Sequence, residues 1–285
     1  MAFIRETKTL LHRDLLLGFH YVRNRLFVAL VFMVVIVSLT VYQFDQMAIH
    51  NQINLANYTY SDLIFEIFEG VDFEIIHNPT KEFPFMWLII LAFCPFIIGG
   101  YVRDDLFNQS SVLFIRTRYQ LSIWLSKLLF CLIIVALFYA MFLLLILGAT
   151  ALFLSFSPDW GALGTVRIAP MMMEEMSPFM FSTHAFLLPL LTSVVLTVIQ
   201  GIGSVFMRPI YILFILLSFL IISIFSSKQL FPGSYSMIVR HELFAGDQGF
   251  DWLGAIVYTV VVIVVTTVGG YILFKKQDII QKEEE

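Results

Sequence analysis

The stretch LLFCLIIVALFYAMFLLLILGATALFLSFS, which runs from Leu128 to Ser157, contains no charged residue and decides the fold class. A helix of about 20 apolar residues crosses a hydrocarbon layer roughly 30 Å thick and satisfies its own backbone hydrogen bonds there. Five further uncharged stretches share this character: Leu26–Phe44, Phe83–Val102, Pro178–Met207, Pro209–Ser227 and Trp252–Phe274. The sequence therefore predicts an all-α, polytopic membrane protein with six transmembrane helices.

The whole chain, 1–285, is predicted to form a single transmembrane domain. Its spans lie at about 26–44, 83–102, 125–153, 180–206, 209–227 and 252–274. The composition agrees, because 59% of the residues are hydrophobic, 13% are charged and the mean hydropathy is +0.88, which excludes an ordinary water-soluble domain. The first span is expected to be a retained anchor rather than a signal peptide, since its nineteen apolar residues exceed a normal signal-peptide core and precede no small-residue cleavage site.

Basic residues gather on one predicted side of the membrane, where they set orientation. Thirteen of the seventeen lie there: Arg5, Lys8, Arg13, Arg23, Arg25, Arg103, Arg116, Arg118, Lys127, Arg208, Lys275, Lys276 and Lys282. The other side receives Lys81, Arg167, Lys228, Arg240 and an acidic first loop. Both termini are therefore expected to be cytoplasmic, in a multi-pass protein of a cell membrane such as a bacterial plasma membrane.

The segment over 4–25 carries apolar Ile4, Leu11, Leu15, Phe19 and Val22 at helical spacing, opposite basic residues. This pattern predicts an amphipathic helix in the cytoplasmic headgroup layer, the alternative being a solvated helix packed on a partner.

The segments over 45–82 and 228–251 are predicted to be external. In the first, Ser61 is expected to cap a short helix. Asp62, Glu66 and Glu69 share a face of that helix, which permits a divalent cation held with His50 or His77, although acids on an exposed face are usually only solvated. No metal site is therefore predicted. The second segment either dips into the outer leaflet or lies along the surface.

Four residues are candidate bending points: Pro95, Gly99, Gly100 and Pro189. Proline removes a helix donor and kinks the chain, and glycine loosens it. Close packing of neighbouring helices is the commoner reason for glycine in a membrane helix.

Several chemistries have no residues to support them. The spans contain no carboxylate, which argues against coupling to an ion gradient, and His184 fits an interfacial position. Cys94 and Cys131 lack metal or redox spacing. No catalytic residue set and no phosphate-binding glycine loop occurs, so the chain is not expected to be an enzyme or to hold a cofactor. A nucleic-acid partner is not expected either.

The loop over 103–118 is the most specific local signal. Asp104 and Asp105 begin it and Arg116 and Arg118 end it, which complements a helix dipole, while Phe107 and its neighbours supply apolar groups. The pattern predicts a cytoplasmic docking helix, the alternative being an interfacial helix that caps the bundle.

At this point the chain resembles the membrane subunits of ATP-binding-cassette (ABC) exporters of the type-two permease class. The resemblance covers nearly the whole chain as an order of parts: a basic amphipathic first helix, six spans with both ends inside, and a Pro-containing external segment after the fifth span. Two sequence motifs support it, namely the acid-led loop ending in Arg116-Thr-Arg118 before Lys127, and the tail Gly269-Gly-Tyr-Ile-Leu-Phe-Lys-Lys-Gln-Asp278.

The resemblance implies a separate ATPase subunit, which holds ATP and Mg²⁺, and a second permease subunit that is identical or paralogous. The coupling helix would dock through Asp104, Asp105, Phe107, Leu113, Phe114, Arg116 and Arg118. The second and fifth spans would face a central cavity. If Phe93, Phe96, Phe214 and Phe219 line it, the exported cargo is apolar or amphipathic, such as a peptide, lipid or drug. The alternative is a membrane scaffold or sensor that docks a cytoplasmic partner without transport.

Overall fold

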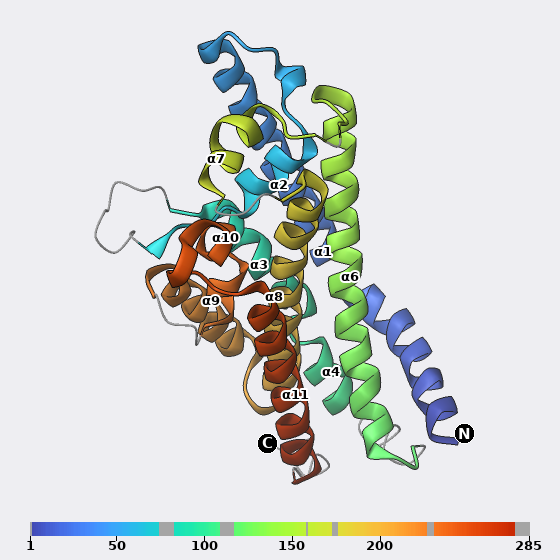
Figure 1. The fold of residues 1–285 in the computed structure, drawn as a ribbon. Coiled ribbons are helices and arrows are strands. Elements are labelled where there is room, and N and C mark those ends of the chain that lie inside the picture. The colour runs from blue at the N-terminus through green and yellow to red at the C-terminus, as the bar shows by residue number, and fades with distance from the viewer. Residues whose placement is uncertain are drawn as a thin grey trace.

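The computed structural model describes residues 2–73, 83–108, 117–157, 159–172, 176–226 and 231–276, except for the side chains of Asn108 and Lys276. Across these ranges the chain is helical and forms no β-strand, only isolated bridges. The helices are α1 (Ala2–Asn51), α2 (Tyr60–Phe68), α3 (Phe85–Ile98), α4 (Tyr101–Asn108), α6 (Gln120–Phe153), α7 (Ala169–Met171), α8 (Pro178–Phe206), α9 (Pro209–Phe225), α10 (Glu242–Ala245) and α11 (Trp252–Lys276). Figure 1 shows the start of α1 and the end of α11 at the same end of the bundle.

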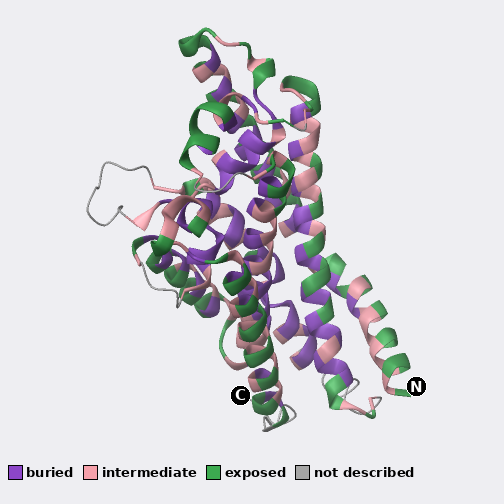
Figure 2. Ribbon diagram, in the orientation of Figure 1, coloured by how far each residue is buried: buried purple, intermediate pink, exposed green. Residues whose placement is uncertain are grey.

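Five helical units in the described chain are long and apolar enough to cross a membrane: α1, α3 together with α4, α6, α8 and α11. The sixth predicted span, α9, has 17 residues. At 1.5 Å per residue it extends roughly 26 Å, which is at the lower limit for a helix that crosses a hydrocarbon layer. Helix α8 lies at the centre and contacts α3, α6, α9 and α11. Figure 2 shows burial concentrated along these inner faces, whereas α11 is largely exposed.

Helix α1 is continuous over 50 residues, which corrects the expected boundary between an interfacial helix over 4–25 and a first span. The segment contains no proline and has Gly18 as its one glycine, so nothing in it breaks the helix. The packed face also differs from the predicted stripe, because Ile4 is 71% exposed and Phe19 is 47% exposed. Its buried residues in this half are Asp14, Gly18, Val22 and Leu26, which recur at helical spacing.

A sharp break separates α3 from α4 at the two predicted glycines. Gly99 has φ +51° and ψ −120°, a backbone conformation that residues with a Cβ atom rarely adopt. A Cβ placed there would also lie 1.9 Å from the Nη1 atom of Arg25. Pro95 remains inside α3 and Pro189 inside α8. The break between α3 and α4 therefore lies at Gly99, whereas both prolines are accommodated within helices.

Helix α2 begins after Thr59, which corrects the expectation that Ser61 caps it. Asp62 is fully buried and accepts hydrogen bonds from the backbone N–H of Thr59 at 3.1 Å and of Gly164 at 2.8 Å. Asp62 is thus turned inward as an anchor. The other two acids of the suggested cation site, Glu66 and Glu69, form ion pairs with Arg167. His77 lies outside the described residues, among which no metal-binding group occurs.

Burial gives Asp62 a testable pH dependence. Desolvation raises its pKa from 3.8 to about 6, against the opposing effect of the backbone N–H donors. Because the folded pKa lies above the unfolded one, proton uptake favours the folded form, and this contribution is lost as the pH rises through 6. Between pH 7 and pH 5, α2 should gain about 1 kcal/mol against local opening. Hydrogen exchange of the α2 amides at the two pH values, corrected for intrinsic rates, measures this gain. The variant Asp62→Asn should abolish it. An equal gain in that variant would show that Asp62 is not the group responsible.

The segment after α9, which was predicted to be external, is buried by protein, as its dip into the outer leaflet would require. Residues 233–241 are all buried. The indole of Trp87 in α3 donates to Ser236 Oγ at 2.9 Å, and Thr192 in α8 donates to the carbonyl of Pro232 at 3.3 Å. Arg240 anchors the segment, since its guanidinium donates to backbone oxygens of Val71, Ser223, Ser226 and Ile224.

Candidate functional site

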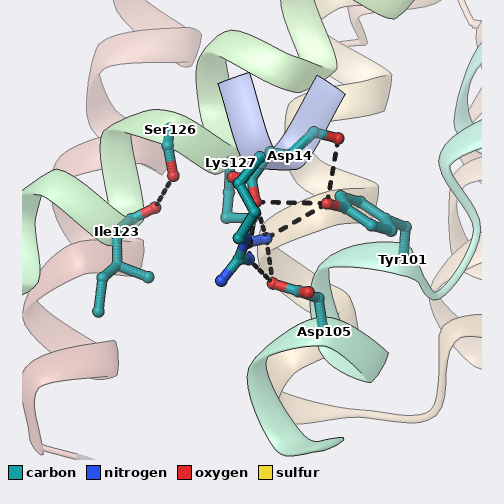
Figure 3. Close-up of polar contacts among 7 residues, drawn as sticks. Asp14, Tyr101, Asp105, Ile123, Ser126 and Lys127 are labelled. Atoms are coloured by element: carbon teal, nitrogen blue, oxygen red, sulfur yellow. Dashed lines mark hydrogen bonds and ion pairs between the residues drawn. The ribbon is translucent and has the colours of Figure 1, made fainter. Parts of the chain in front are cut away.

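A buried ionic cluster joins α1, α4 and α6 near the end of the molecule where both termini lie. Lys127 of α6 stands between two carboxylates, donating to Asp14 Oδ1 at 2.8 Å and to Asp105. Arg13 pairs with Asp14 at 2.7 Å and also with Asp105. Figure 3 shows Lys127, Asp14 and Asp105 converging with Tyr101. One carboxylate thus comes from α1 and the other from α4, and the α6 lysine holds both.

Tyr101 completes the cluster from α4, one helical turn before Asp105. Its hydroxyl lies 3.4 Å from Asp14 Oδ1 and 3.3 Å from the Asp14 carbonyl. The ammonium of Lys127 lies 4.8 Å from the centre of the Tyr101 ring, within range of a cation–π interaction. A neighbouring bond, from the Tyr21 hydroxyl to Asp104 at 2.7 Å, joins α1 and α4 a second time.

The cluster is electrically neutral, with two cations and two carboxylates, and nearly dry. The side chains of Asp14, Lys127 and Asp105 are 0%, 3% and 5% exposed. Burying a charge costs several kcal/mol, and each of these three buried groups has a partner of opposite charge, while Arg13 is 25% exposed. Asp14 Oδ2 and Arg13 Nε have no hydrogen-bond partner within the described structure. Such a set fixes the relative positions of three helices more than it adds net stability.

Close packing beside the cluster depends on Gly18. A Cβ at this position would lie 2.5 Å from Phe130 of α6 and 2.8 Å from Tyr101 of α4. The absent side chain lets α1 approach both helices closely enough for Asp14 to reach Lys127.

Alanine substitutions at Gly18 and at Gly148 distinguish the effect of close packing on stability from the effect of helix propensity. Gly18→Ala should destabilise the protein by roughly 1–3 kcal/mol, because the new methyl group overlaps Phe130. Gly148→Ala in α6, where a Cβ meets nothing within 4 Å, is the matched control and should stabilise by about 0.5–1 kcal/mol through helix propensity. Thermal unfolding in detergent measures both, and equal effects would contradict the close approach.

The predicted docking residues divide into three groups. Asp104 and Asp105 belong to α4 but face inward, toward Tyr21 and the ionic cluster. The Phe107 ring is partly buried, with Arg103 stacked 5.3 Å from its centre, and Arg118 is exposed before α6. The remaining three lie outside the described residues: Leu113, Phe114 and Arg116. The carboxylates therefore act within the chain, rather than standing free for a partner.

The predicted cavity-lining phenylalanines lie on two contacting helices, α3 and α9. Phe93 packs between Phe32 and Phe96, with ring centres 5.2 Å and 6.0 Å apart. Phe214 and Phe219 of α9 are 60% and 43% exposed. In one copy of the chain, these two α9 rings line the outer surface of the bundle.

Sequence reasoning placed Arg13 on a polar face and Lys127 at the start of a span, and it assigned no role to Asp14 or Tyr101. One signal was available. Asp14 and Gly18 are four residues apart, as are Tyr101 and Asp105, so each pair shares a helix face. The spacing shows which residues share a face, but it does not show which helices cover that face.

A protein-family model described as "Protein of unknown function (DUF2705)" matches residues 30–280. No curated protein and no solved structure matches the chain.

Proposed function

As the chain belongs to the DUF2705 family, described only as proteins of unknown function, we propose its activity from its helices and charges. We propose that it is the permease subunit of an ABC exporter. In this proposal a separate ATPase subunit hydrolyses ATP, and two permease subunits move an apolar or amphipathic cargo outward.

The topology proposed is six crossings, by α1, α3 with α4, α6, α8, α9 and α11. An even number of crossings accords with the two chain ends lying at the same end of the bundle (Figure 1). Exposed basic residues at that end are Arg5, Lys8, Arg23, Arg118, Arg208 and Lys275. Because basic residues mark the cytoplasmic side, this end is proposed to face the cytoplasm.

The observation that carries the proposal is the connection of α4 to the rest of the bundle. Helix α4 leads directly into the predicted docking loop. The ionic cluster ties α4 to α1 and α6, and Gly99 separates it from α3. A displacement of the loop by a partner would therefore move three helices together. Such a connection is needed if ATP hydrolysis in a partner moves the transmembrane helices by displacing a cytoplasmic loop, rather than by changing the charge of groups within the spans.

The second half of the proposal concerns the cargo path. Phe214 and Phe219 present aromatic surface from α9, and Phe96 presents an exposed ring from α3, which contacts α9. We propose that a second permease subunit packs against this side and that the rings line the path between them. ATP binding in the partner would shift a two-state equilibrium from an inward-facing to an outward-facing arrangement.

Reconstitution tests transport directly. The chain and its ATPase are placed together in vesicles, and accumulation of a fluorescent hydrophobic dye is followed with ATP and with a non-hydrolysable analogue. The proposal predicts dye movement that requires both proteins and hydrolysis. Assembly and ATP hydrolysis without movement of dye, labelled lipid or hydrophobic peptide would favour the scaffold or sensor instead.

Docking through the loop makes a separate prediction. Leu113→Asp together with Phe114→Asp should weaken ATPase binding at least about tenfold, since apolar anchors dominate such contacts. Leu253→Asn, an exposed position at the far end of α11, serves as the control and should leave binding unchanged. Pull-down of the ATPase measures this, and undiminished binding by the loop variant would remove the docking assignment.

A further inference from the structure

A cavity of about 480 Å³ opens at the end of the molecule away from both chain termini. It lies between the turn that follows α1 and the segment that joins α6 to α7 (Figure 1). Its volume falls within the range of small-molecule sites, roughly 300–1,000 Å³. It is remote from the ionic cluster and has no part in the proposed transport step.

The two walls of the cavity are held together by backbone contacts. The N–H of Ser155 donates to the carbonyl of Tyr58 at 2.9 Å, and buried Asp62 ties Thr59 to Gly164 from below. Gly161 fits closely against this anchor, since a Cβ there would lie 2.0 Å from Asp62 Oδ2. The cavity is therefore formed before any ligand arrives.

Its lining offers one carboxylate and no base. Asp159 is exposed, and within the described structure its carboxylate accepts one hydrogen bond, from Ser157 Oγ at 3.2 Å, with no cation paired to it. The Asn57 side chain is exposed beside it and makes no side-chain hydrogen bond to any described residue. Trp160 adds an aromatic ring, held by Phe181 with ring centres 5.3 Å apart.

The described arginines of the adjoining segments do not compete for Asp159. Arg167 is paired with Glu69, and Arg240 is buried. Because no base lines the cavity, the charge that it presents to a ligand is the carboxylate of Asp159, which attracts a cation.

We propose that this cavity binds an organic cation bearing an ammonium or guanidinium group. The charged group lies against Asp159, where a charge-assisted hydrogen bond forms, and the hydrocarbon part lies against Trp160, Ile53 and Val166. Asn57 accepts a remaining donor of the ligand. The group belongs either to a soluble amine or to an aminophospholipid headgroup at the outer surface.

Binding is measured without ATP or the partner ATPase, so its outcome is independent of the proposed transport function. The chain is placed in nanodiscs of phosphatidylglycerol and titrated with Nα-acetylarginine ethyl ester, with neutral Nα-acetylcitrulline ethyl ester as the matched probe. Saturable binding of the arginine ester is expected, weakened at least about tenfold in Asp159→Asn. Asp247→Asn, which removes an equally exposed carboxylate away from the cavity, should bind as the unchanged protein does.

A second set of nanodiscs containing phosphatidylethanolamine distinguishes the two sources. Loss of apparent affinity for the arginine ester there identifies the lipid headgroup as a competitor, and unchanged affinity identifies a soluble amine. The proposal is overturned if the arginine ester shows no saturable binding in either membrane, if the citrulline ester binds equally well, or if Asp159→Asn binds like the unchanged protein.

Discussion

Replacing Lys127 by methionine is expected to destabilise the folded protein by about 3–5 kcal/mol, which lowers the unfolding temperature by roughly 10 °C. The substitution leaves Asp14 and Asp105 facing one another across a dry interior with only Arg13 between them. An uncompensated buried charge carries a large desolvation cost, and this cost is the source of the effect. Thermal unfolding of the detergent-solubilised protein measures it.

Two companion variants separate the ionic explanation from loss of packing. Lys127→Met combined with Asp105→Leu removes one cation and one anion together, and it should recover at least about half of the lost stability. Lys8→Gln, at an exposed position on α1, should stay within about 0.5 kcal/mol of the unchanged protein. A double variant as unstable as the sum of its single changes would contradict the cluster. If the double variant assembles with the ATPase, it should hydrolyse ATP with reduced transport, because α4 is then less firmly joined to α6.

Replacing Arg240 by methionine should release the segment 231–251 and cost at least about 3 kcal/mol. The guanidinium supplies donors to four backbone oxygens, including those of Ser223 and Ile224 at the end of α9. Burial lowers its pKa to about 10, so the cation persists at neutral pH. Without it, four carbonyl groups lose a donor in a buried place, and hydrogen exchange of residues 233–241 should accelerate by at least about a hundredfold.

Arg240→Lys provides the graded comparison, because an ammonium keeps the charge but lacks the planar fork of donors. It should retain part of the protection. Arg167→Met removes an exposed arginine whose ion pairs face solvent, and its effect should stay below about 1 kcal/mol. Exchange in Arg240→Met that matches the unchanged protein would show that the segment is held by other contacts.

The apolar stretches predicted the positions of most of the long helices. The predicted span at 209–227 and the observed α9 begin at the same residue, and the stretch from Trp252 matches α11. The predicted span over 125–153 lies within α6, which runs from Gln120 to Phe153. The burial of Lys127 inside α6 was not predicted, because it depends on carboxylates that α1 and α4 supply.

The candidate site was harder to predict for the same reason. Asp105 is paired with Arg13, which is 92 residues away in sequence, and Arg240 donates to Val71 across 169 residues. A helical repeat shows which face of a helix is apolar but not which helix covers it. Asp104 and Asp105 were therefore identified as functional from their place in the loop, and their partners became evident only from the packing of α1.

Affinity purification of the tagged chain from its native membrane, under mild detergent, tests the central claim most directly. The account predicts that a second protein with a phosphate-binding glycine loop co-purifies in fixed stoichiometry and that the complex hydrolyses ATP, whereas the separated chain does not. The account would be contradicted if the chain is recovered without any nucleotide-binding protein and is active in that isolated form.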